Sequence, residues 1–262
     1  MFNIDNLSVS YSQQQILEKI NLQVNSRDFI TIIGENGCGK STLLRCIAGL
    51  HSEFTGNIQL DNKELGDWST KALAQKRAFV AQSNQVYFAF LTEDVLGLGR
   101  ANRAETNQYT TTLICQVAEQ VGISHLFGRD VRTLSGGERQ RVFIAKALLQ
   151  LMPDMNDAET QQPFNGKLLL LDEPTSALDF RFQKATMDLM QRFCEQGLAV
   201  ICVSHDINLV LPYATKTLLL ANGRCLAQGP VIDVITEDNL FKCFGVRPRL
   251  IPQDNAIPFV TH

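Results

Sequence analysis

Glycine, lysine and hydroxyl residues follow an early apolar run in an order suited to binding phosphate. Residues 29–33 (FITII) precede residues 34–42 (GENGCGKST), which fit G-x-x-x-x-G-K-[ST] between a strand and a helix. Glycines let the backbone approach an anion closely, and the N–H groups of a helix start then face it. Lys40 would reach the β- and γ-phosphates of a nucleotide, and Ser41 would ligate Mg²⁺. The residues expected to bind nucleotide here are Gly34, Asn36, Gly37, Cys38, Gly39, Lys40, Ser41 and Thr42.

Cys38 lies inside this loop, where its thiol could be reactive. Neighbouring helix-end N–H groups and the charge of Lys40 tend to lower the pKa of a thiol. We therefore expect alkylation of Cys38 to block nucleotide binding, the alternative being that it is an inert small residue.

Two acids stand at the carboxyl end of a second apolar run. Four leucines at 168–171 are followed by Asp172 and Glu173, and open α/β sheets place their ligands at such strand ends. Asp172 is suited to hold Mg²⁺, and Glu173 to orient and polarise an attacking water as a general base. Without further motifs, the phosphate loop fits a kinase or a GTPase equally well, and the acids fit a solvated strand end.

A second glycine turn, residues 134–140 (LSGGERQ), opens a long amphipathic stretch. Ser135 and the N–H groups of Gly136 and Gly137 would stand at the positive end of a helix, which can bind a γ-phosphate. Ser135 followed three residues later by Glu138 also fits a capping box. The two interpretations are compatible, and the segment resembles the signature of the ABC (ATP-binding cassette) family.

The chain up to about residue 245 resembles the nucleotide-binding subunit of ABC transporters. The resemblance implies that Gln82 is the Q-loop glutamine, Asp179 the D-loop aspartate, His205 the switch histidine and Tyr11 the aromatic that stacks on adenine. It implies catalytic roles for Glu173, His205, Lys40 and Gln82, Mg²⁺ ligation by Ser41, Gln82 and Asp172, and further ATP contacts at Tyr11, Ser135, Gly136, Gly137, Glu138 and Asp179. In the family, each ATP lies between the phosphate loop of one subunit and the signature of another, so we expect a homodimer.

Elements that would position these residues follow an α/β pattern. Apolar runs at 29–33, 168–171, 199–203 and 217–220 alternate with helical-period stretches, which indicates a mostly parallel sheet covered by helices. Residues 4–9, 16–24 and 56–60 predict an antiparallel β flank, and 110–121 and 138–151 predict helices of a subdomain inserted at about 90–155. These elements agree with the resemblance, which implies a P-loop NTPase fold of ABC type at 1–245, and the sequence adds an exposed loop at 152–166 and a short tail at 246–262.

Composition restricts the partners and the compartment. The net charge of −3 lacks the basic excess of nucleic-acid-binding proteins, so no nucleic acid is expected. Seven cysteines without C-x-x-C pairs favour a reducing cytoplasm. Neither a signal peptide nor an apolar run of about 18 residues is visible, so the sequence predicts no membrane span.

The resemblance extends to importers of haem, ferric siderophores and cobalamin. It is carried by residues 68–69, 73–74, 77–78, 87–91 and 97–100 and by the polar insertion before residue 168. It implies integral permease subunits contacting residues 85–91, a periplasmic or surface substrate-binding protein, and a peripheral position on the cytoplasmic face of the inner (plasma) membrane. Haem is the first choice of cargo, with cobalamin or a ferric siderophore as alternatives. A different class, a soluble ABC ATPase not coupled to transport, lacks support because the sequence shows neither a coiled-coil interruption nor a duplicated cassette.

Overall fold

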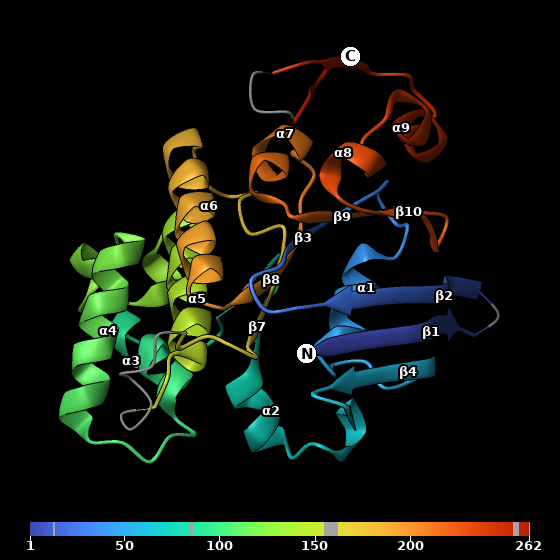
Figure 1. The fold of residues 1–262 in the computed structure, drawn as a ribbon. Coiled ribbons are helices and arrows are strands. Elements are labelled where there is room, and N and C mark those ends of the chain that lie inside the picture. Colours follow the sequence, from blue (N-terminus) through green and yellow to red (C-terminus); the bar gives the residue numbers. More distant parts are fainter. Residues whose placement is uncertain (13, 84–85, 155–161, 254–256, 262) are drawn as a thin grey trace.

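A six-stranded sheet forms the centre of the computed structural model, which describes residues 1–12, 14–83, 86–154, 162–253 and 257–261 (Figure 1). The strand order is β10 (Arg224–Gly229), β9 (Lys216–Ala221), β3 (Phe29–Ile33), β8 (Ala199–Val203), β7 (Leu168–Asp172) and β6 (Arg77–Val80). All neighbours pair in parallel except β10 with β9. Every residue of β3, β7 and β8 is buried, which explains their continuous apolar sequences and confirms the predicted sheet.

The predicted antiparallel flank is also present. Its order is β2 (Gln14–Val24), β1 (Phe2–Tyr11), β4 (Thr55–Leu60) and β5 (Lys63–Glu64). Helix α1 (Lys40–Ile47) buries Leu43, Leu44 and Ile47 in a cluster shared with inward residues of the flank and of β3. The flank therefore fixes the helix that follows the phosphate loop.

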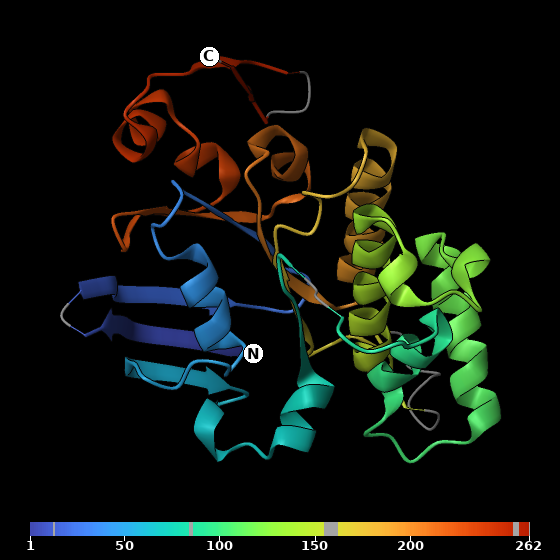
Figure 2. The ribbon, with the colours of Figure 1, turned by 180° about the vertical axis from the view of Figure 1, so that it is seen from behind.

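Helices cover the other side of the central sheet and extend into a separate helical subdomain (Figure 2). They are α3 (Thr92–Gly97), α4 (Asn107–Val121), α5 (Gly136–Leu151) and α6 (Phe180–Glu195), with the short turns η2 (Leu98–Arg100), η3 (Ser124–Leu126) and η4 (Val131–Thr133). Helix α4 begins where the Thr106 side chain accepts from the Tyr109 N–H, and it ends at Gly122, whose φ is 72°. The structure thus confirms both expected helices. Each begins slightly before its predicted range, because a capping residue and not the apolar period sets its first residue.

The C-terminal part packs as a third layer on the end of the central sheet (Figure 1). It comprises α7 (Ile207–Val210), η6 (Leu211–Tyr213), α8 (Val231–Val234), α9 (Glu237–Phe244) and a hairpin of β11 (Arg249–Ile251) and β12 (Phe259–Thr261). Along the chain, η1 (Leu65–Asp67) and α2 (Thr70–Lys76) connect the flank to β6. The domain boundary at residue 245 stays a prediction, and most of the predicted exposed loop, residues 155–161, is outside the described residues. Among the described residues, no helix combines the length and apolar character needed to cross a bilayer.

Candidate nucleotide site

The phosphate loop joins β3 to α1 and ends at the first turn of that helix. Gly39 stands at the N-cap of α1 with a φ of 105°, a conformation that costs glycine nothing, and no side chain caps the helix. The first-turn N–H groups have no intrahelical partner and are free to bind an anion. Gly34 lies so close to the backbone of β9 that a Cβ atom there would be 2.2 Å from the Leu220 carbonyl oxygen.

Lys40 is buried under this loop, with its side chain folded against the loop backbone. Its Nζ donates to the carbonyl oxygens of Gly34 at 2.8 Å and Glu35 at 2.7 Å. The ammonium group therefore lies beside the loop, near the position that the sequence assigns to it. A phosphate that entered the loop would replace the two carbonyl oxygens as hydrogen-bond acceptors.

Asp172 ends β7 directly beside the start of α1. The Ser41 hydroxyl donates to Asp172 Oδ1 at 3.1 Å, which unites two of the expected Mg²⁺ ligands. Burial raises the pKa of Asp172, and the hydrogen bond from Ser41 opposes this rise. A hydroxyl and a carboxylate, with the Gln82 amide nearby, form an oxygen donor set that fits Mg²⁺.

Glu173 lies one residue beyond the strand and is held from two sides. Gln82 Nε2, following β6, donates to Glu173 Oε2 at 2.7 Å, and His205 Nε2, following β8, contacts Oε1. Glu173 has a φ of 51°, in the left-handed region that a residue other than glycine adopts at a cost of roughly 1–2 kcal/mol. Because β6 and β8 both neighbour β7, the sheet order itself brings these three side chains together.

A cavity of about 440 Å³ connects the loop with this carboxylate. Its walls contain Tyr11, Asn36, Gly37, Gly39, Lys40, Ser41, Thr42, Gln82, Glu173 and His205, all expected from the sequence, together with Ile16. Tyr11, 44% exposed, stands at the end of β1 with its ring edge-on to His51, at a centroid distance of 5.2 Å. Ile16 was not predicted, because an isolated isoleucine in a strand carries no chemical signal.

Cys38 contradicts the expectation of an activated thiol. Its side chain is buried, and burial raises the pKa of the thiol above the ordinary 9.0, while the charge of Lys40 only partly opposes this. The expected pKa decrease was wrong because the thiol packs towards Gly34 and the backbone of β9 rather than into the open cavity.

The signature segment forms a second, separate cluster. Ser135 Oγ accepts from the Glu138 N–H at 3.2 Å, and a Glu138 carboxylate oxygen accepts from the Ser135 N–H at 2.8 Å, a complete capping box. A Cβ on Gly137 would lie 2.9 Å from the carbonyl oxygen of Ala177, two residues before Asp179, which is the N-cap of α6. The residues Ser135, Gly136, Gly137, Glu138 and Asp179 do not line the 440 Å³ cavity, so one chain does not bring the two predicted sets together.

Comparisons with known sequences agree with the motifs. The family described as ABC transporter matches residues 17–155. The hemin import ATP-binding protein HmuV of Pseudomonas aeruginosa is 37% identical over 246 residues, covering 94% of this chain and 93% of that protein. The protein of the same name from Bradyrhizobium diazoefficiens is 34% identical, covering 97% of this chain and 91% of the relative.

Solved structures resemble the whole fold. An inward-facing structure described as a metal-chelate type ABC transporter has a TM-score of 0.77 and 28% identity, covering 99% of this chain and 95% of that chain. A dimeric ATP-binding cassette in a post-hydrolysis state, bound to ADP and Pi, has a TM-score of 0.75 and 25% identity, covering 88% of this chain and 98% of that chain.

Proposed function

The chain belongs to the ABC transporter family as an ATP-hydrolysing subunit, and on that premise we propose that it drives the import of haem through a membrane permease. The similarity to hemin import ATP-binding proteins, over nearly the whole chain, supports the cargo. The observation that carries the hydrolytic role is Glu173, held by Gln82 and His205 in the cavity that also contains the phosphate loop.

Hydrolysis begins with a water molecule near Glu173. The carboxylate accepts a proton from this water as the oxygen attacks the γ-phosphorus of ATP, and the bond to the ADP oxygen breaks to give phosphate. Lys40 and the first-turn N–H groups of α1 hold the phosphates, while Gln82 and His205 keep the carboxylate in place. Ser41, Asp172 and Gln82 would hold Mg²⁺, which supplies positive charge to the phosphate oxygens.

A homodimer would complete each site. The phosphate loop and the signature cluster of one chain lie apart, and both are anion-binding helix starts, so two chains in antiparallel contact would enclose each ATP between them. Loss of the γ-phosphate would remove the bonds to Ser135 and Gly137 and allow the pair to open. This opening would move the permease.

An exposed aromatic surface just after Gln82 would receive the permease. Tyr87 and Phe88 are 76% and 73% exposed, and Leu91 is 42% exposed; Gln85 lies outside the described residues. Exposed aromatic groups are typical of protein contacts. In this assembly the chain would work at the cytoplasmic face of the inner membrane, and a substrate-binding protein would deliver cargo to the opposite face.

The hydrolytic role is tested with Glu173→Gln. The amide cannot accept the water proton, so phosphate release should fall about 10²- to 10⁴-fold while ATP still binds. Both are measured on the purified protein, with the exposed Glu119→Gln as the matched control. Ordinary turnover by Glu173→Gln would contradict the assigned role.

Cargo is tested by growth of a strain that lacks this chain, given haem, a ferric siderophore or cobalamin as the only relevant source. Loss of growth on haem alone, restored by the parent chain but not by Glu173→Gln, is the expected result. Loss on another chelate would replace haem by that cargo. Unchanged growth on all three would reject import of these chelates and favour an ATPase that is not coupled to transport.

A further inference from the structure

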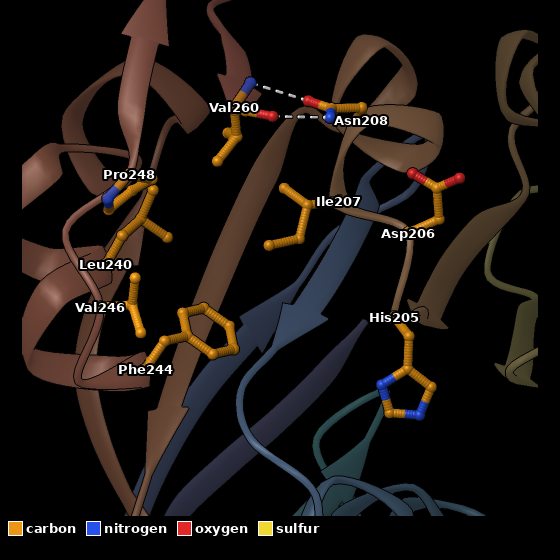
Figure 3. A pocket seen from close by; sticks show the side chains of 9 residues that line it. All are labelled: His205, Asp206, Ile207, Asn208, Leu240, Phe244, Val246, Pro248 and Val260. Carbon is orange, nitrogen blue, oxygen red and sulfur yellow. Dashed lines mark hydrogen bonds between the residues drawn. The ribbon is translucent and has the colours of Figure 1, made fainter. Parts of the chain in front are cut away.

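The side chain of Asn208 is tied to the C-terminal hairpin by two hydrogen bonds. Asn208 Nδ2 donates to the Val260 carbonyl oxygen at 2.9 Å, and the Val260 N–H donates to Asn208 Oδ1 at 2.8 Å (Figure 3). The pair joins α7 to β12 across 52 positions of sequence. Asn208 follows His205, the residue that contacts Glu173, by three positions.

The loop bearing His205 is short and held mainly at its ends. Ser204 Oγ accepts from the Asp206 N–H at 3.1 Å, and Asp206 caps α7 by accepting from the Leu209 N–H at 3.0 Å. Helix α7 has four residues, and a single helical turn has little stability of its own. Its orientation therefore depends on contacts with the neighbouring elements.

On the side facing the hairpin, those contacts are incomplete. A cavity of about 580 Å³ separates His205, Ile207 and Asn208 from Leu240 and Phe244 of α9 and from the segment around Val246 (Figure 3). Close packing normally fixes an element, and here that packing is interrupted. The double hydrogen bond spans this gap at its upper end in the view of Figure 3, while His205 lies at the opposite end.

We propose that Asn208 and β12 act as a positioning clamp for His205. By holding α7 against the hairpin, the clamp keeps the preceding loop in the place where the imidazole meets Glu173. Asn208 does not line the nucleotide cavity, so the clamp reaches that site only through the placement of His205. The inference rests on the proposed roles of His205 and Glu173, and it adds a residue and an element that those roles do not contain.

The first measurement is the kcat and KM of Asn208→Leu for ATP. Leucine makes neither hydrogen bond, and misplacement of a catalytic group by a fraction of an ångström to one ångström costs about tenfold or more in rate. We expect kcat to fall about tenfold, with KM within about twofold of the parent. Asn208→Asp keeps the bond from the Val260 N–H and loses the bond to the Val260 carbonyl oxygen. Its kcat should therefore lie between those of the parent and Asn208→Leu.

Asn239→Leu is the matched control, because Asn239 is also half-buried in the C-terminal layer and donates from Nδ2 to the Val234 carbonyl oxygen at 2.9 Å. It should leave kcat unchanged even where it lowers the unfolding temperature. An equal kcat loss in Asn239→Leu and Asn208→Leu would overturn the clamp and leave a general effect of stability.

A double variant separates positioning from stability. If Asn208 acts through His205, adding Asn208→Leu to His205→Ala should lower kcat no further, whereas independent effects would multiply. If the two substitutions lower kcat by factors that multiply in the double variant, the clamp is overturned. It is also overturned if Asn208→Leu keeps the parental kcat while His205→Ala is impaired; the proposed role of His205 survives in both cases. Parental turnover in His205→Ala would overturn the proposed role of His205, and the clamp with it.

Discussion

At the scale of single residues, Glu173 shows what the sequence could and could not reveal. Two acids after four leucines predict a polar strand end, and the motif order suggests a general base. The left-handed backbone of Glu173 and the bond from Gln82 depend on the neighbouring strands, so no local pattern predicts them. Strain of this kind is typical of functional sites, where the surrounding structure enforces it.

Cys38 gives a prediction at the same scale. Since burial raises the pKa of its thiol, little thiolate exists near neutral pH, and N-ethylmaleimide should modify Cys38 more slowly than the exposed Cys115, by about tenfold or more. The rate at Cys38 should rise with pH beyond 9.0, as the thiolate forms. Peptide mass spectrometry after timed alkylation measures both sites in one sample, and equal rates at pH 7 would show that the thiol is not buried.

At the scale of elements, Arg100 holds the end of α5. Its guanidinium donates to the carbonyl oxygens of Leu149, Met152 and Pro153 at 2.8–3.0 Å and pairs with Glu105, and both charged side chains are almost completely buried. Carbonyl groups at the end of a helix need such donors. This contact connects the helical subdomain to the segment that leads into the predicted polar insertion.

Arg100→Met should therefore be strongly destabilising. It leaves the buried carboxylate of Glu105 without its partner, at a cost of about 3 kcal/mol in the free energy of unfolding. Urea unfolding followed by circular dichroism measures this cost. Arg132→Met removes an exposed pair with Asp130 and should change the unfolding midpoint little; similar shifts in both variants would mean that burial of the Arg100 pair is unimportant.

Several elements that the sequence did not predict are short. Strand β6 is four residues that follow α2 directly, with no turn residues between them. Strands β11 and β12 have three residues each and exist through pairing with one another. Periodicity needs longer segments to be informative, so α4 and α5 were predictable and the hairpin that holds Asn208 was not.

At the scale of the whole molecule, the separation of the phosphate loop from the signature segment predicts complementation between damaged chains. Lys40→Ala removes the phosphate-loop cation, and Ser135→Asp keeps a good helix cap but places negative charge where a γ-phosphate would bind. Each variant alone should hydrolyse little ATP. Their mixture should regain turnover, because a mixed dimer contains one undamaged pair of loop and signature.

Phosphate release from the mixture, compared with each variant alone at the same total concentration, measures this effect. A mixture no more active than its components would contradict sites shared between chains.

Sheet order could not be read from residue spacing, although the order β6–β7–β8 is what brings Gln82, Glu173 and His205 together. Only the resemblance to a family implied that proximity.

The bonds from Lys40 to its own loop have a consequence for synthesis in a starved cell. A buried ammonium group without hydrogen-bond acceptors would destabilise the fold until a nucleotide supplied them. In this chain the Gly34 and Glu35 carbonyl oxygens already accept from Lys40. Nucleotide binding would exchange these bonds for bonds to phosphate, so we expect the chain to fold without nucleotide. A chain synthesised while ATP is scarce should then fold without nucleotide and bind ATP once the concentration of ATP rises.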